Sequence, residues 1–184
     1  MGSAEKLEEE MLISKSLEKA INEQIGRELG AQMQYVNIAS YFTAENMLLF
    51  GKLFFVQASE ENGHAMKFVR YVLDAGGRIA VPAIPEARAD FKSPEDAVAA
   101  ALKWEEEVTV QINGLMDIAF KEKDYIAQEF LGWFANEQLE EVNKMSTILS
   151  VVKRSGDNLL LAEQYVQQTL TDIESVKSGS TAKT

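Results

Sequence analysis

The sequence predicts an all-α fold, in which four long helices form a bundle with one long crossover and a short fifth helix follows. Two observations carry this prediction. The 184 residues include only three prolines and contain long stretches without turn residues, a pattern that favours helices over strands. Apolar residues make up 46% of the chain and recur at the spacing of one helix face, so one sizeable core is expected.

Local signals set the expected helix ends. Gly76 and Gly77 supply a stop for the second helix, and Ser93 and Pro94 supply a cap and a first turn for the third. The expected helices cover residues 14–42, 47–75, 93–122, 125–154 and 158–174. Residues 1–13 are expected to be a flexible extension, 14–174 the folded domain and 175–184 a disordered tail.

The lengths of the connections predict the topology. Short turns make the first and second helices antiparallel, and likewise the third and fourth. A helix of about thirty residues is about 45 Å long. The segment from Gly76 to Lys92 contains Pro82 and Pro85, and its roughly seventeen residues can reach about 55–60 Å when extended. It can therefore run the length of the bundle and leave the second and third helices parallel.

Charge and composition exclude several classes of function. The formal net charge of −11 argues against nucleic acid as a partner, because neutralising phosphates needs a basic face. The absence of cysteine excludes disulfides, thiolate zinc sites and iron–sulfur clusters. We find no apolar run that could span a bilayer and no leader pattern, so the expectation is no membrane association and a cytoplasmic location.

The chain contains one histidine, and it lies one helical turn after an acid. Glu61 and His64 are spaced i, i+3 on the second helix, which puts a carboxylate and an imidazole on one face. Taken alone, the pair is more often solvated than metal-binding.

The other long helices strengthen the metal interpretation. Each places at least one acid near the middle of its apolar face, namely Glu28 on the first helix, Glu105 on the third, and Glu137 and Glu141 beside Gln138 on the fourth. The inward series of the third helix is expected to include Val98, Leu102, Glu105, Thr109 and Ile112. Four buried carboxylates at one level would repel one another, and no Lys or Arg is expected on these faces. Protonation could relieve part of the repulsion, and a pair of divalent cations would resolve it. The oxygen-rich ligand set suits iron or manganese.

At this point the residues resemble those of the ferritins, specifically the haem-free bacterial type, over nearly the whole chain. The most specific strings are NEQIGREL at 22–29, EENGHA at 60–65 and WFANEQLEE at 133–141. The resemblance implies that Glu28, Glu61 and His64 hold a first iron, and that Glu61 bridges to a second held by Glu105, with Glu141 and Gln138 beside it. It further implies an accessory third iron site at Glu60, Glu137 and Glu140, and an electron-donating role for Tyr35.

Two departures from related families narrow the expectation. Bacterioferritins and rubrerythrins carry a second Glu-x-x-His on the fourth helix, where this chain has Gln138 and Glu141. The residue after the bridging glutamate is Asn62, not the haem-ligating methionine of bacterioferritins, so no haem is expected.

The expected function is therefore iron storage with ferroxidase activity. Fe²⁺ would be oxidised by O₂ or H₂O₂ at a di-iron centre within the subunit and stored as ferric mineral inside a homo-oligomeric cage, which the resemblance makes twenty-four subunits. One alternative is a non-storing di-iron or di-manganese redox enzyme, such as a peroxidase-like protein. The other is a non-catalytic helical interaction module whose inner acids are protonated or surrounded by water.

Overall fold

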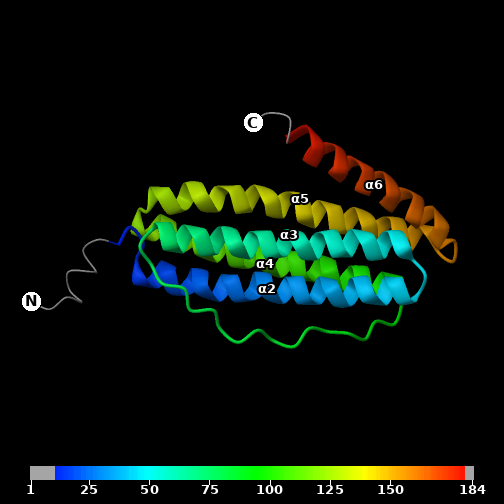
Figure 1. The fold of residues 1–184 in the computed structure, drawn as a ribbon, viewed down its shortest axis with the longest axis horizontal. Coiled ribbons are helices and arrows are strands. Elements are labelled where there is room, and N and C mark those ends of the chain that lie inside the picture. The colour runs from blue at the N-terminus through cyan, green and yellow to red at the C-terminus, as the bar shows by residue number, and fades with distance from the viewer. Residues whose placement is uncertain (1–10, 181–184) are drawn as a thin grey trace, which may run out of the picture.

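The computed structural model describes residues 11–180, with side chains as far as residue 173. Four long helices lie side by side and a fifth crosses one end of the bundle (Figure 1). The helices are α2 (Lys15–Ala44), α3 (Leu48–Asp74), α4 (Pro94–Glu122), α5 (Tyr125–Ser155) and α6 (Leu159–Ser180). The all-α class and the predicted helix order are confirmed.

Side-chain caps fix the starts of three long helices. Ser14 Oγ accepts from the backbone N–H of Leu17 at 3.0 Å, and Ser93 Oγ accepts from that of Asp96 at 3.2 Å. Asp124 does the same for α5, where Ala127 N–H lies 2.9 Å from the carboxylate. Each cap satisfies a backbone donor that the first helical turn leaves unpaired, so the tight turn between α4 and α5 also starts the next helix.

The segment between α3 and α4 runs in an extended path along the outside of α2 (Figure 1). Two side-chain amides of α2 hold it there. Asn22 donates to the Arg78 carbonyl at 2.9 Å and accepts from Ala80 N–H at 2.6 Å. Gln34 makes the same paired contact with the carbonyl and N–H of Arg88, both at 2.9 Å. These contacts satisfy backbone groups that a long loop would otherwise leave to solvent, and they confirm the predicted crossover.

Two apolar clusters fill the bundle, one toward each end. One contains Tyr35, Phe42, Phe50 and Phe54, together with buried residues of α6. The other contains Ile21, Ile25, Phe68 and Phe134. The two clusters are separated along each helix by buried polar residues, which are Glu28, Glu61, His64, Glu105, Gln138 and Glu141. The apolar ends hold a polar middle layer at one level of the bundle.

Both ends of the described chain differ from the predicted boundaries. Ile13, in the predicted N-terminal extension, is buried, and Leu12 N–H donates to the Ala75 carbonyl at 2.9 Å. At the other end, α6 continues through Ser180, past its predicted end at Glu174. Residues 1–10 and 181–184, which belong to the predicted extension and tail, lie outside the described residues. Within the described part, no helix combines the length and apolar character needed to cross a bilayer.

Candidate metal centre

The polar middle layer brings together side chains from all four long helices. Glu28 comes from α2, Glu61 and His64 from α3, Glu105 from α4, and Glu141 from α5, and none of them is more than 5% exposed. Ionised carboxylates are rarely buried without a counter-charge. This concentration of acids therefore requires protons, cations or both.

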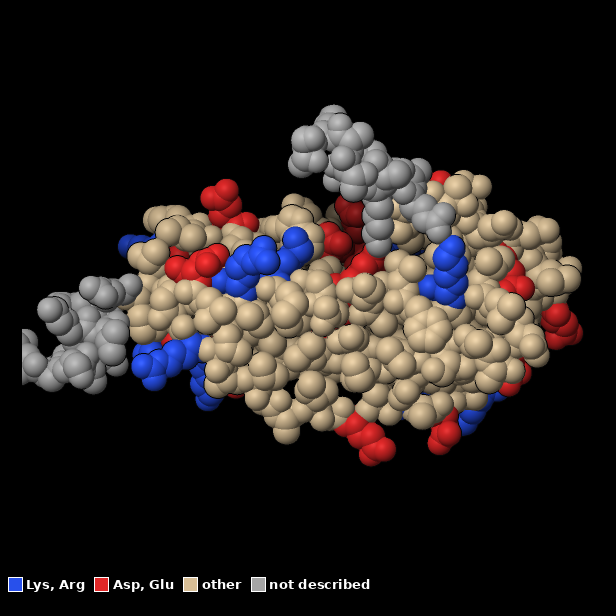
Figure 2. Space-filling model, viewed as in Figure 1, with Lys and Arg blue, Asp and Glu red and all other residues tan. Residues whose placement is uncertain are grey.

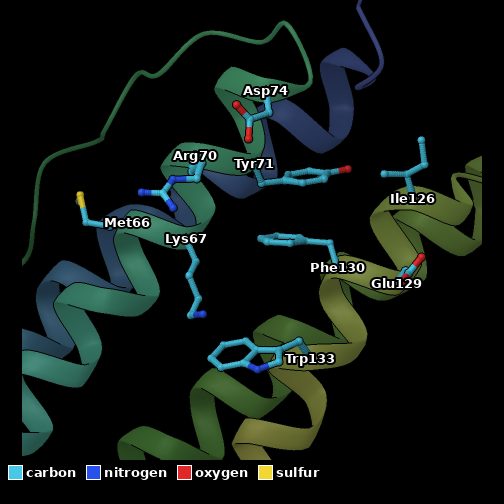
Figure 3. Close-up of a pocket in the computed structure, with 9 residues that line it drawn as sticks. All are labelled: Met66, Lys67, Arg70, Tyr71, Asp74, Ile126, Glu129, Phe130 and Trp133. Atoms are coloured by element: carbon cyan, nitrogen blue, oxygen red, sulfur yellow. The ribbon is translucent and has the colours of Figure 1, made fainter. Parts of the chain in front are cut away.

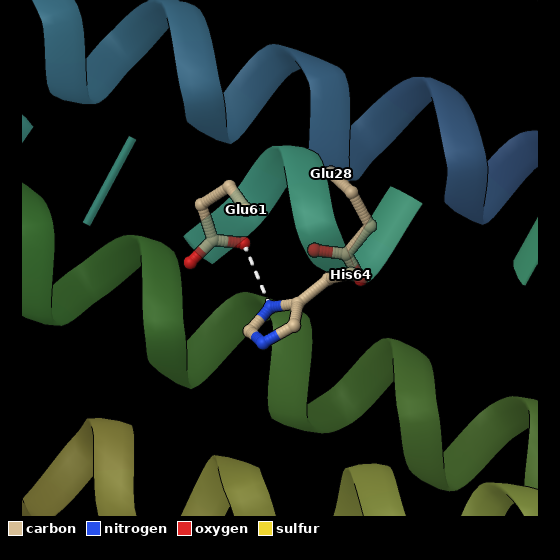
Figure 4. Close-up of side chains that lie close together, drawn as sticks. All are labelled: Glu28, Glu61 and His64. Atoms are coloured by element: carbon tan, nitrogen blue, oxygen red, sulfur yellow. Dashed lines mark hydrogen bonds and ion pairs between the residues drawn. The ribbon is translucent and has the colours of Figure 1, made fainter. Parts of the chain in front are cut away.

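Glu28, Glu61 and His64 form the tightest group. One ligand atom from each lies within 4.8 Å of the others, and Figure 4 shows the three side chains converging from α2 and α3. Glu61 Oε2 is 3.3 Å from His64 Nδ1. Gln24 donates to Glu28 Oε1 at 2.9 Å.

Two carboxylate oxygens of this group are orphaned. Glu28 Oε2 and Glu61 Oε1 are buried and receive no hydrogen bond while both carboxylates are ionised; a hydrogen bond between the two carboxyl groups requires that one of them holds a proton. A buried acceptor without a donor is costly. Both oxygens belong to the group in which a single cation could be bound, so the donor set fits a divalent metal with oxygen and imidazole ligands.

Glu105 anchors the opposite side of the layer. Tyr35 donates its hydroxyl hydrogen bond to Glu105 Oε1, and Gln138 Nε2 lies 3.1 Å from both Glu105 Oε2 and the Glu105 carbonyl oxygen. The neutral Tyr35 and Gln138 thus orient a buried carboxylate without neutralising it. Tyr35 and Gln138 therefore set the direction in which the remaining lone pairs of the Glu105 carboxylate point.

Burial and mutual repulsion raise the pKa values of these acids. Burial raises the pKa of Glu28 well above its usual range, and neighbouring Glu61 adds to the effect. Burial, with Glu105 and Glu141 nearby, does the same to the pKa of Glu61. The pKa of Glu105 rises to about 7 for the same primary reason, with Tyr35 and Gln138 opposing the rise. Metal-free protein therefore retains protons here at neutral pH that a bound cation would displace.

The expectation that no lysine or arginine faces the acids is wrong. Lys144 Nζ lies 2.6 Å from Glu141 Oε1 and 2.8 Å from Gln57 Oε1. Burial alone would lower the lysine's pKa, but Glu141 and Glu60 raise it above its ordinary value. Position along the helix predicts where Cβ points, whereas the four-carbon stem of lysine carries its ammonium group back toward the acids.

The residues assigned to an accessory site lie at the rim of the layer. Glu60 Oε2 is 3.7 Å from Lys144 Nζ, and Glu137 Oε1 is 3.8 Å from His64 Nε2. Glu140 is exposed and close enough to contribute to the raised pKa of Glu137. On the face shown in Figure 2, acidic side chains gather near the middle of the molecule, in the hollow between α3 and α5.

Sequence reasoning did not predict the contacts that three further polar residues make with the acids. Gln24 and Gln57 each precede an acid by one helical turn on the same helix, and Lys144 follows Glu141 at i+3. Residues at these spacings share a face with the acid. The helical spacing is therefore the sequence signal that places these three side chains beside the acids.

A surface pocket of about 600 Å³ lies beside the centre between α3 and α5 (Figure 3). Tyr71 and Phe130 stack within it with ring centroids 4.1 Å apart, and Lys67 Nζ lies 4.1 Å from the Trp133 ring centroid. Trp133 also contacts His64 edge-on, at 5.7 Å between centroids. The residues that line the pocket are Met66, Lys67, Arg70, Tyr71, Asp74, Ile126, Glu129, Phe130 and Trp133. The pocket shares Trp133 with the surroundings of His64, but the buried carboxylates do not line it.

Comparison with known proteins identifies the family. A model of the ferritin-like domain matches residues 18–155. Ferritin BfrB of Mycobacterium tuberculosis is 39% identical over 160 residues, which cover 87% of this chain and 88% of that protein. The bacterial non-heme ferritin of Staphylococcus aureus is 34% identical over 147 residues, covering 80% and 89% respectively.

Solved structures agree with the sequence comparisons. An open pore ferritin from the archaeon Archaeoglobus fulgidus superposes with a TM-score of 0.82 at 31% identity, covering 85% of this chain and 96% of that one. The four-helix bundle with its crossover, the buried acids of the middle layer and these relatives lead to one conclusion: the chain belongs to the ferritin family.

Proposed function

We propose that the protein oxidises Fe²⁺ at a paired site within each subunit and stores the product as ferric mineral. The observation that carries the proposal is the buried group of Glu28, Glu61 and His64, whose ligand atoms lie within 4.8 Å of one another and include two orphaned carboxylate oxygens. The iron in this proposal is the substrate and the cargo, so the site must bind it, oxidise it and release it.

The first iron would be bound by Glu28, Glu61 and His64. Gln24 holds one oxygen of Glu28, which leaves the orphaned Oε2 for the metal. Because Glu61 is close enough to Glu105 and Glu141 for them to raise its pKa, its carboxylate is suited to bridge toward a second iron. Two carboxylates and one imidazole match the preference of Fe²⁺ and Fe³⁺ for oxygen and nitrogen ligands.

The second iron would be bound by Glu61 and Glu105, with Glu141 and Gln138 beside it. Anionic ligands stabilise Fe³⁺ more than Fe²⁺, because the attraction grows with the charge of the ion. Loss of one electron from each iron delivers two electrons to the oxidant. With two protons, these electrons convert O₂ to H₂O₂, or H₂O₂ to two waters. The protons displaced from the buried acids by iron are available for this step.

Tyr35 is suited to a supporting redox role. It is fully buried, and its hydroxyl donates to Glu105. Burial raises its pKa well above the ordinary tyrosine value, with Glu105 adding to the effect, so the side chain stays a neutral phenol at neutral pH. We assign Tyr35 the role of donating an electron to the oxidant at the paired site. Glu105 is placed to accept the phenolic proton.

The storage part of the proposal is supported by the family to which the chain belongs. Relatives named as ferritins support a hollow homo-oligomer, proposed here as a twenty-four-subunit cage in the cytoplasm. The ferric product would move from the paired site past the acids at the rim of the middle layer and mineralise inside the cage.

Iron loading followed by size-exclusion chromatography tests this proposal. Fe²⁺ is added in air in large excess over subunits, and iron and protein are measured in each fraction. The expected result is many iron atoms per subunit, eluting with one very large particle. Uptake that stops near two iron atoms per subunit on a small oligomer would contradict storage and favour a non-storing di-iron redox enzyme.

A further inference from the structure

Lys144 reaches from α5 into the acidic middle layer at its solvent-facing side. Its side chain is only 21% exposed. The ammonium nitrogen lies 2.6 Å from Glu141 Oε1, 2.8 Å from Gln57 Oε1 and 3.7 Å from Glu60 Oε2. Three oxygen atoms from two helices therefore surround one positive charge.

Glu141 is fully engaged by this arrangement. Its Oε1 accepts from Lys144, and its Oε2 accepts from Gln57 Nε2 at 2.8 Å. Gln57 in turn accepts from Lys144 through its own carbonyl oxygen. The three side chains form a closed set in which the lysine supplies the charge and the glutamine fixes the geometry, so Glu141 needs no further cation to be satisfied.

Other ion pairs on these helices differ from this one. Lys153 and Glu95 are 3.6 Å apart and each is about half exposed, at 53% and 54%. Such exposed pairs contribute little and do not hold a side chain in one position. Lys144 is held by shorter contacts in a site with less access to water, where electrostatic attraction is stronger.

We propose that Lys144 is a tethered counter-cation that takes the place of an accessory third metal ion, so that each subunit holds two metal ions and not three. This inference rests on the proposed function for the paired site itself. A divalent ion bound through Glu60 would lie near the Lys144 ammonium and would repel it. The acids at the rim therefore do not fit an accessory iron while Lys144 occupies its present position.

The proposal predicts that removing the charge of Lys144 creates a third metal position. Zn²⁺, which is redox-silent, is titrated calorimetrically into metal-free oligomer to count tightly bound ions. Lys144→Gln is expected to bind one more Zn²⁺ per subunit than the unmodified protein, because Glu60 and Glu141 both lose the ammonium group that each contacts. Lys144→Arg keeps the charge and Lys153→Gln removes an exposed lysine, so neither is expected to gain an ion.

A second substitution checks where the extra ion binds. Adding Glu60→Gln to Lys144→Gln is expected to return the count to that of the unmodified protein. Equal counts for the unmodified protein and Lys144→Gln would overturn the proposal, as would a gain that survives Glu60→Gln. If Lys144→Gln does not fold, the unmodified protein decides: two ions support the proposal, and three overturn it.

The same Zn²⁺ titration distinguishes failure of the proposed function from failure of this inference. An unmodified subunit that binds fewer than two Zn²⁺ contradicts the paired site. The difference in count between that protein and Lys144→Gln still decides the role of the lysine.

Discussion

Replacing Glu61 with glutamine is expected to slow Fe²⁺ oxidation by at least about tenfold and to stabilise the metal-free protein by about 1–3 kcal/mol. Glu61 is the acid that interacts with both sides of the layer, with His64 at 3.3 Å on one side and Glu105 on the other. Glutamine keeps the shape but removes the charge needed to bind iron. The same change relieves the repulsion that buried Glu61 experiences in metal-free protein.

The opposite signs of these two effects distinguish a metal site from a structural one. Oxidation is followed by the absorbance of Fe³⁺, and stability by chemical denaturation of metal-free protein. Glu106→Gln is the matched control, because Glu106 is adjacent in sequence to Glu105 but exposed, and it is expected to change neither quantity appreciably. An unchanged rate of Fe²⁺ oxidation in Glu61→Gln would contradict the assignment of Glu61 as an iron ligand. A large loss of stability would show that the acid has a structural role.

The stability of the metal-free protein is expected to fall as pH rises from about 4.5 to about 7. Glu105 has a folded-state pKa of about 7 against an ordinary value of 4.5. The folded protein therefore binds more protons than the unfolded chain in this interval, and the free energy of unfolding decreases with pH. For this one carboxylate the loss is about 3 kcal/mol across the interval, and the raised pKa values of Glu28 and Glu61 act in the same direction.

Denaturation curves at several pH values test this dependence. The Glu105→Gln variant is expected to show a shallower decline, because it lacks one of the groups that bind the extra protons. Protein loaded with Zn²⁺ is expected to show the reverse trend, since the metal requires deprotonated ligands. Stability that increases with pH in metal-free protein would contradict the raised pKa values.

The architecture could be predicted because its determinants are local in the sequence. The Ser93–Pro94 start of α4 and the length of the crossover depend on neighbouring residues and on the reach of the chain. The choice of inward positions was less accurate on long helices. Leu102 and Thr109 are half-buried in α4, whereas Ala101 and Val108 are buried. Adjacent residues are about 100° apart around the helix axis, so both can lie within one wide apolar face, and packing against a second helix decides which of them is buried.

The candidate site could be predicted only as far as backbone direction determines it. Glu28, Glu61, His64 and Glu105 extend inward from Cβ positions that the helical period places correctly. The i+3 spacing puts Lys144 on the same side of α5 as Glu141, but it does not predict where the ammonium group lies, because that group is several bonds from the backbone and its position depends on the charges nearby. Helical period places Gln57 on the inward face of α3, but it does not predict the contact of the Gln57 amide with Glu141, which forms only when α3 and α5 pack together.

The most direct test of the central claim is to locate iron in crystals of the protein exposed to Fe²⁺ without oxygen, using anomalous diffraction at the iron absorption edge. The predicted result is two iron atoms in each subunit, one at Glu28, Glu61 and His64 and one between Glu61 and Glu105. Iron confined to the molecular surface, with none at the buried carboxylates, would contradict the paired site and with it the proposed ferroxidase function.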